Sequence, residues 1–124
     1  MNVVDSSAWL EYFADGPNAS VFAPVVVDLT SLIVPVITIY EVFKRVLKDR
    51  GETDAIQVVA SMTQGKVVDV TLPLALTAAR MSVELRLPMA DSLILATARA
   101  FDAMLWTQDA DFEGLPRVRY VPKS

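Results

Sequence analysis

Short apolar runs alternate along this chain with longer segments in which apolar residues recur every three or four positions. Nearly uncharged runs rich in Val, Ile and Leu are typical of strands buried on both faces of a sheet, whereas the three-to-four spacing is typical of amphipathic helices. This alternation predicts a parallel sheet covered by helices on both faces. The predicted strands are 1–4, 32–37, 66–72, 103–107 and 118–121.

The ends of the predicted helices carry residues that start and stop helices. Gly51 and Gly65 close two of them, and Pro73 suits the first turn of another. The predicted helices are 7–14, 20–29, 38–50, 53–65, 73–87 and 90–101. With 124 residues and no repeat or linker, we expect one domain, residues 1–124. Its expected class is α/β, a three-layer α/β/α sandwich with a central, mainly parallel sheet of four to five strands.

One apolar segment, residues 21–40, has the length of a membrane span. Pro24 and Pro35 interrupt it, and the central Asp28 would cost about 2.5–3.5 kcal/mol on insertion. The N-terminus lacks the basic and apolar regions of a signal peptide. The absence of Cys fits a reducing compartment. We therefore expect a cytoplasmic protein that does not enter the membrane.

The chemistry open to this chain is restricted, because it contains no His and no Cys. Thiol nucleophiles, imidazole bases and thiolate zinc sites are therefore excluded. Four acids, Asp5, Glu41, Asp91 and Asp109, lie where a predicted strand ends or a predicted helix begins. Ligands of parallel sheets bind beyond the carboxyl ends of the strands. If these positions meet, the repulsion between the carboxylates predicts a hard cation, Mg²⁺ or Mn²⁺.

Each acid also has a structural explanation. Glu41 completes a capping box that begins at Thr38, and Asp91 is favoured in a first turn by the helix dipole. Asp5 could cap the first helix, and Asp109 could form an Asx turn. Taken singly, the structural explanation is favoured for every acid. Taken together, the acids favour a shared site, because all of them fall on the same predicted edge of the sheet.

The segments around these acids resemble the four acidic motifs of PIN-domain ribonucleases, and specifically of stand-alone VapC-type toxins. The segments read VVDSSA (3–8), IVPVITIYEV (33–42), LPMADSLILATA (87–98) and WTQDADF (106–112). They occur in the family's order over nearly the whole chain. Asp5, Glu41, Asp91 and Asp109 stand at the acidic positions, and Thr107 matches an accompanying hydroxyl.

The resemblance implies a PIN-like fold and a metal-dependent endoribonuclease that leaves a 5′-phosphate and a 3′-hydroxyl. Asp5, Asp91 and Asp109 would bind one or two Mg²⁺ or Mn²⁺ ions, which activate a water for attack on phosphorus. Glu41 would ligate through a water or orient the nucleophile. The expected supporting residues are Ser6 or Ser7, Thr107 and Asp111. The implied partners are an RNA substrate, a VapB-type antitoxin and a second copy in a homodimer.

Two surfaces have both a functional and a structural interpretation. A basic run on the helix of Glu41 could follow a phosphate backbone, or could simply be solvated. It consists of Lys44, Arg45, Lys48 and Arg50. Aromatic and apolar residues of the first two helices could line a groove for an amphipathic antitoxin segment, or could be core. They are Trp9, Tyr12, Phe13, Val21, Phe22 and Val25.

Net charge does not separate the classes of function. The formal charge of −4 lacks the basic footprint of most nucleic-acid binders, but two divalent cations would neutralise it. A phosphoreceiver domain would need an acidic pair after the first strand, an Asp after the third and a late Lys, and the chain has none of these. A catalytically inactive PIN module that serves as a binding platform stays open. Asp5→Asn separates the two, since an enzyme would lose activity whereas a binding module would keep its partner.

Overall fold

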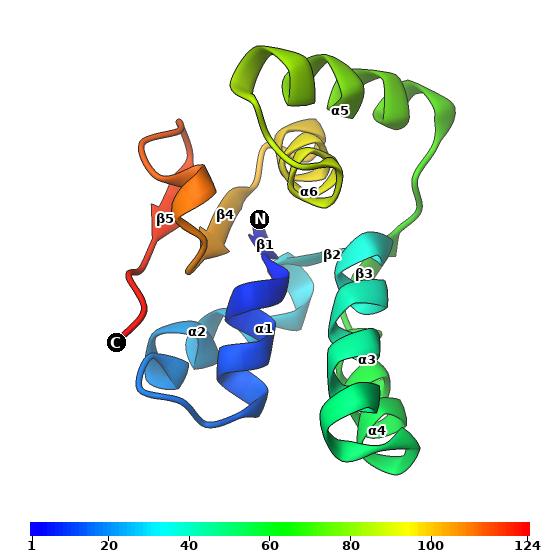
Figure 1. Ribbon diagram of the computed structural model, residues 1–124, viewed down its shortest axis with the longest axis vertical. Coiled ribbons are helices and arrows are strands. Elements are labelled where there is room, and N and C mark those ends of the chain that lie inside the picture. The colour runs from blue at the N-terminus through cyan, green and yellow to red at the C-terminus, as the bar shows by residue number, and fades with distance from the viewer.

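The computed structural model describes residues 1–124 and contains a five-stranded sheet in the order β3-β2-β1-β4-β5 (Figure 1). Every neighbouring pair of strands is parallel. This confirms the α/β class, with five strands and a sheet that is parallel throughout. The strands are β1 (Asn2–Val4), β2 (Leu32–Pro35), β3 (Lys66–Val68), β4 (Met104–Thr107) and β5 (Val118–Tyr120).

Six helices cover the sheet and complete the predicted three-layer sandwich (Figure 1). They are α1 (Ser6–Phe13), α2 (Ala19–Val26), α3 (Val36–Arg50), α4 (Glu52–Met62), α5 (Leu72–Leu85) and α6 (Met89–Ala100). Two single turns of 3₁₀ helix, η1 (Leu29–Ser31) and η2 (Ala110–Phe112), precede β2 and follow β4. None of the helices combines the length and apolar character needed to cross a membrane.

The two faces of the sheet bury two separate apolar clusters. Val4 and Val34 pack with α1, α2, α3 and α4 on one face, whereas Val3 and Ile33 pack with α6 on the other. Neighbouring residues of a strand point to opposite faces, so these strands need apolar residues at every position. Their uninterrupted apolar character follows from this burial on both sides.

Two predicted strands are longer in the sequence pattern than in the structure. The run 32–37 leaves the sheet at Pro35, which precedes α3 with an extended backbone. Ile37 packs from the helix into the second cluster, so an apolar residue here serves a helix rather than a strand. The run 66–72 ends at Val68, because β3 is an edge strand paired only through residues 66–68.

Gly65 lies where the chain passes close to β2. A Cβ atom added at this position would lie 2.8 Å from Val34 Cγ2 and 3.0 Å from Leu32 Cδ2. Because both neighbours are buried, Gly65→Ala is expected to lower the free energy of unfolding by about 1–3 kcal/mol, measured by urea denaturation. In the control Gly114→Ala nothing lies near the added atom, but φ is +84°, so only backbone strain of about 1 kcal/mol is expected. Unchanged stability of Gly65→Ala would contradict this packing.

Candidate functional site

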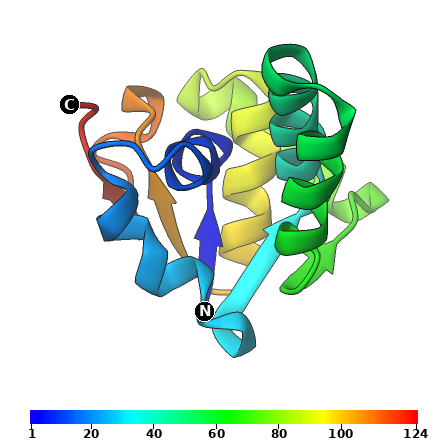
Figure 2. The same ribbon diagram turned by 90° about the horizontal axis from the view of Figure 1, so that it is seen from below.

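The chain changes direction within the sheet at β1. β2 and β3 lie on one side of β1 in the sheet, whereas β4 and β5 lie on its other side. The arrows of β1, β2 and β4 point to the same edge, where α1 begins (Figure 2). Such a switch point leaves a crevice beyond the carboxyl ends of the strands, where open parallel sheets bind ligands. Asp5 and Asp109 follow the two strands that flank it, and the Asp5 amide donates to the Trp106 carbonyl at 2.9 Å.

Asp5 is almost completely buried, with 3% of its surface exposed. As the N-cap of α1, it accepts a hydrogen bond from the Ser7 amide. Its Oδ2 also accepts from Ser7 Oγ at 2.7 Å and from Thr107 Oγ1 at 2.8 Å. Burial raises the pKa of Asp5 above its ordinary value, and these hydrogen bonds oppose the shift without cancelling it. The predicted capping role and a role in a site therefore coincide in one residue.

Ser7 and Thr107 join the ends of β1 and β4. The Thr107 hydroxyl donates to Asp5 and accepts from the Asp109 amide at 2.9 Å. Ser7 Oγ accepts from the Gln108 amide at 3.0 Å. Two hydroxyls thus fix the position of one acid relative to another that is distant in the sequence.

Replacing Thr107 with Val keeps the shape of the side chain but removes its hydroxyl. The Asp109 amide then loses its acceptor and Asp5 loses a donor, in a place where Thr107 itself is fully buried. We expect the free energy of unfolding to fall by about 1–3 kcal/mol, measured by urea denaturation. Thr107→Ser, which retains the hydroxyl, is the matched control and should lose less. Equal losses in both variants would assign the effect to packing instead.

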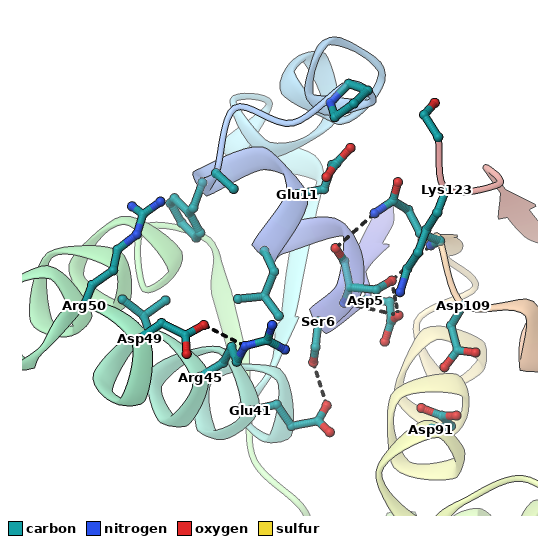
Figure 3. Close-up of a pocket in the computed structure, with 18 residues that line it drawn as sticks. Asp5, Ser6, Glu11, Glu41, Arg45, Asp49, Arg50, Asp91, Asp109 and Lys123 are labelled. Atoms are coloured by element: carbon teal, nitrogen blue, oxygen red, sulfur yellow. Dashed lines mark hydrogen bonds and ion pairs between the residues drawn. The ribbon is translucent and has the colours of Figure 1, made fainter.

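Glu41 points to the same crevice from the first turns of α3 (Figure 3). Its Oε1 accepts a hydrogen bond from Ser6 Oγ at 2.6 Å. The predicted capping box is wrong, because α3 begins two residues before Thr38, and the Thr38 hydroxyl donates to the Pro35 carbonyl. Glu41 therefore has no helix-capping task, and its carboxylate is held by α1 instead.

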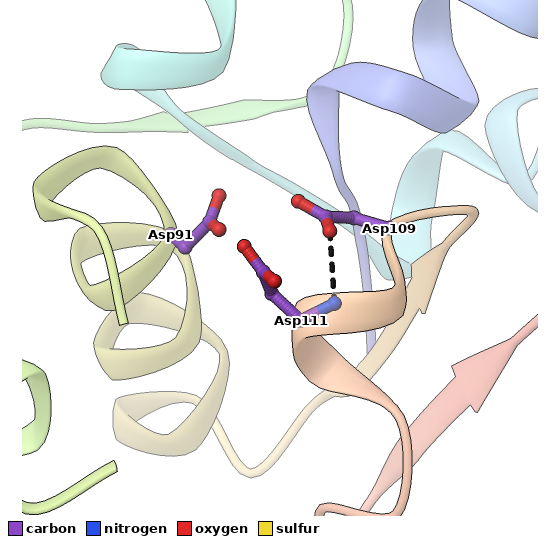
Figure 4. A group of neighbouring side chains, drawn as sticks. All are labelled: Asp91, Asp109 and Asp111. Carbon is purple, nitrogen blue, oxygen red and sulfur yellow. Dashed lines mark hydrogen bonds between the residues drawn. The ribbon is translucent and has the colours of Figure 1, made fainter. Parts of the chain in front are cut away.

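Asp91, in the first turn of α6, faces Asp109, the N-cap of η2, and Asp111 within η2 across the crevice (Figure 4). One carboxylate oxygen from each of the three lies within 4.8 Å of the others. Asp109 Oδ1 accepts from the Asp111 amide at 2.9 Å, which is the predicted Asx turn. Burial, followed by the negative charges of Asp109, Asp5 and Asp111, raises the pKa of Asp91 to about 8.

The donor set of this cluster fits a hard divalent cation. Mg²⁺ and Mn²⁺ prefer carboxylate oxygens, and neither ion pair of the protein involves these acids. Asp5 was predicted as a ligand with Asp91 and Asp109, yet the closest cluster contains Asp111 in its place. Asp5 lines the same pocket, and its charge acts on Asp91.

A pocket of about 590 Å³ extends from the acids along α1 and α3 (Figure 3). Leu10, Phe13 and Val46 form its apolar part, and Arg45 and Arg50 lie beyond Glu41. The aromatic and apolar residues of the first two helices, for which both a groove and the core were expected, divide between the two, and Phe13 lines the pocket. Three of these residues belong to the core, where they fill the space between the helices and the sheet: Trp9, Phe22 and Val25.

Sequence reasoning missed a polar link beside the site. Asn18, between α1 and α2, donates through Nδ2 to Gln108 Oε1 at 2.7 Å and to the Pro122 carbonyl at 2.9 Å. Gln108 is buried. Its position in the sequence between Thr107 and Asp109 could have indicated that it lies at the site. Nothing local in the sequence distinguishes Asn18 or Lys123, which lines the pocket, because both depend on distant parts of the chain.

The comparisons with known proteins concern the family and the fold of the chain. The family model of the PIN domain matches residues 3–118. A toxin–antitoxin complex from Klebsiella pneumoniae contains a chain with a TM-score of 0.83 and 20% identity, and all of both chains is covered. VapC20 of Mycobacterium tuberculosis, a toxin that cleaves the sarcin-ricin loop, has a TM-score of 0.77 and 21% identity, with 96% of this chain and 99% of that chain covered.

VapBC2 of Rickettsia felis, solved with a promoter DNA fragment, contains a chain with a TM-score of 0.74 and 14% identity. The alignment covers 99% of this chain and 98% of that one. At these identities the solved structures show the shared fold. A comparison with curated protein sequences finds no match.

Proposed function

This chain belongs to the PIN-domain family, and we propose that it is a metal-dependent endoribonuclease of VapC type, the toxin of a toxin–antitoxin pair. We treat residues 1–124 as a single PIN domain that acts in the cytoplasm. The observation that carries the proposal is the convergence of Asp5, Glu41, Asp91 and Asp109 on one pocket. A protein without His or Cys has oxygen atoms as its metal ligands, and this pocket brings four carboxylates together.

Asp5, Asp91 and Asp109 would hold the cation, with Asp111 close enough to contribute. The bound cation supplies positive charge that activates water and stabilises the charge that develops on the phosphate. Ser7 and Thr107 keep the Asp5 carboxylate in one orientation. Ser6 keeps Glu41 turned toward the crevice, where it can orient the attacking water. Fixed orientation matters because a small misplacement of a catalytic group lowers the rate strongly.

The proposed partner is a VapB-type antitoxin. The solved structures of the same fold include toxin–antitoxin complexes from Klebsiella pneumoniae and Rickettsia felis. The pocket beside the acids combines an apolar part, Leu10, Phe13 and Val46, with charged residues at its rim. An amphipathic segment that binds there would cover the acids and block access of RNA.

Cleavage of a labelled panel of structured RNAs by the purified protein tests the function. Cutting at discrete sites with Mg²⁺ or Mn²⁺, and none with EDTA, is the expected result. A folded protein that binds no Mn²⁺ and cuts no RNA would favour the inactive binding platform. Cutting that persists in EDTA would contradict the proposed role of the cation.

We also infer that the proposed homodimer forms through α5. Leu72, Leu76, Ala79 and Val83 lie on its exposed side, with 74% of Leu72 and 82% of Val83 accessible. Their spacing of four, three and four residues is that of a seam between two packed helices. Ala79 lies near the middle of this row of residues, where its small side chain allows two such helices to approach closely. The α5 helix of a second copy carries the same apolar residues, so the two helices can pack against each other about a twofold axis.

Leu76→Arg is expected to convert a dimer into a monomer, because it places charge in the middle of the apolar seam. Light scattering coupled to size exclusion gives the mass in solution. Val27→Arg, at another exposed apolar residue, is the matched control and should leave the dimer intact. A wild-type protein that is monomeric at high concentration, or a dimeric Leu76→Arg variant, would contradict this interface.

A further inference from the structure

Tyr40 is an aromatic residue that the core does not use. Its side chain is 60% exposed, and it is the sole aromatic residue among the exposed large apolar side chains. It lies on α3 directly before Glu41, whose carboxylate is held by Ser6. An exposed ring leaves an apolar face in contact with water, so beside an acid of the pocket it can stack against a ligand with a flat face.

Lys44 lies one helical turn after Tyr40, with its Nζ 5.8 Å from the centre of the ring. This cation–π contact favours one position of both side chains. The charge of Lys44 is not neutralised by a carboxylate, since the ion pairs of the protein join Arg45 to Asp49 and Arg117 to Asp102. The pair therefore offers an aromatic face and an unpaired cation together.

We propose that Tyr40 and Lys44 form a stacking platform for an unpaired base of the RNA, next to the phosphate at the acidic site. This inference rests on the proposed ribonuclease function. The base would stack on the Tyr40 ring, and Lys44 would contact the adjoining phosphate. The platform selects nucleotides in loops, bulges or single strands, because the bases of a duplex are stacked on each other and cannot present a free face.

The placement on α3 supports this assignment. Consecutive helical residues are about 100° apart around the axis and rise about 1.5 Å, so Tyr40 lies on the side of α3 next to Glu41, just outside the residues that line the pocket. Arg45, which follows Glu41 by one turn, lines the same pocket. A strand whose phosphate lies at the acids thus has an aromatic ring on one side of Glu41 and basic residues along the helix.

Cleavage kinetics of Tyr40→Ala on single-stranded oligo(A) test the platform. Base stacking on aromatic rings changes affinity by roughly 5- to 150-fold, so we expect KM to rise about tenfold with little change in kcat. Tyr40→Trp should restore KM, whereas Tyr40→Leu should not, because an apolar surface without a ring is insufficient. Ile56→Ala, at an exposed residue of α4, is the matched control and should leave KM unchanged.

The same RNA annealed to oligo(U) gives a second comparison. The Tyr40→Ala substitution should not change KM for the duplex, which cannot use the platform.

The role of Lys44 is tested by the salt dependence of binding, measured in EDTA by the anisotropy of labelled oligo(A) from low salt upward. The slope of log affinity against log salt concentration should be smaller by about 0.7 in Lys44→Gln than in the wild type. Lys44→Arg should retain the slope.

The failures of the two proposals are distinguishable. A wild-type protein that neither binds nor cuts any RNA would overturn the ribonuclease function and the platform together. A wild-type protein that cuts oligo(A), with unchanged KM in Tyr40→Ala, would overturn the platform alone. The same would follow if Tyr40→Ala weakened binding of the antitoxin but not of RNA, since the ring would then serve the protein partner.

Discussion

Asp91→Asn is expected to reduce RNA cleavage by at least about 10³-fold, which corresponds to about 4 kcal/mol of transition-state stabilisation. Asp91 belongs to the cluster whose carboxylate oxygens lie within 4.8 Å of one another. Asparagine keeps the shape of the side chain but removes the negative charge that holds a divalent cation. Single-turnover cleavage of a labelled RNA gives the rate directly, without a contribution from product release.

The same substitution should stabilise the metal-free protein at alkaline pH. The pKa of Asp91 is about 8 in the folded protein, against an ordinary value of 3.8. Between these values the folded state binds more protons than the unfolded state, so the free energy of unfolding falls as the pH rises. The contribution is complete below the ordinary pKa and is lost as the pH passes 8. Asparagine does not ionise, so the free energy of unfolding of Asp91→Asn does not decline in this way as the pH rises.

Thermal unfolding in EDTA measures the difference. We expect Asp91→Asn to have a higher Tm than the wild type at pH 8 and a similar Tm at low pH. Because Asp91 is only partly buried, water screens the effect, and a gain of several degrees corresponds to about 1 kcal/mol. Asp28→Asn, at an exposed acid before β2 at the opposite edge of the sheet, is the matched control. Loss of both activity and stability would indicate a folding defect instead.

Mn²⁺ should stabilise the wild-type protein strongly at pH 8. A ligand that binds only the folded state adds about 2.7 kcal/mol at a concentration one hundred times its Kd, which raises Tm by about 10 °C. Asp91→Asn and Asp109→Asn should lose most of this increase, because each removes one carboxylate of the cluster. A titration of Tm against Mn²⁺ concentration, with Asp28→Asn as control, measures the effect.

The increase in Tm should be smaller at pH 6 than at pH 8. A cation binds the ionised carboxylate, and the raised pKa of Asp91 means that protons compete for the site below about pH 8. Binding of Mn²⁺ should accordingly release protons, which calorimetry in buffers of different ionisation enthalpy detects. An equal increase in Tm for wild type and both variants would show that Mn²⁺ binds elsewhere.

The layers of the fold could be predicted because they depend on local patterns. Apolar runs in β1 and β2 and the periodicity of the helices each report burial of one segment. The limits of β2 and β3 could not be predicted, since pairing with a neighbour decides where a strand ends. Pro35 ends β2 within an apolar run, and β3 stops where its single partner strand stops.

The acids of the site could be predicted because each lies next to a recognisable strand end or helix start. Their contacts could not. Thr38 and Glu41 have the spacing of a capping box, yet Glu41 bonds to Ser6, thirty-five positions away. The role of Ser7 depends in the same way on Gln108. Trp9 and Phe22 have the composition of a binding surface, and only the packing of α1 and α2 on the sheet shows that they are core.

The interior position of β4 in the sheet has a consequence for synthesis of the protein. Thr107 bonds to Asp5 across 102 positions of sequence, and β4 inserts between β1 and β5. A nascent chain that has not yet exposed β4 outside the ribosome therefore holds Asp5 without Thr107, and Asp91 without Asp109 and Asp111. Translation products that stop before β4 lack Asp109 and Asp111, two of the three clustered carboxylates. In a protein of this design the acidic cluster is completed only once β4 and η2 have left the ribosome, so the proposed RNA cleavage is withheld until then.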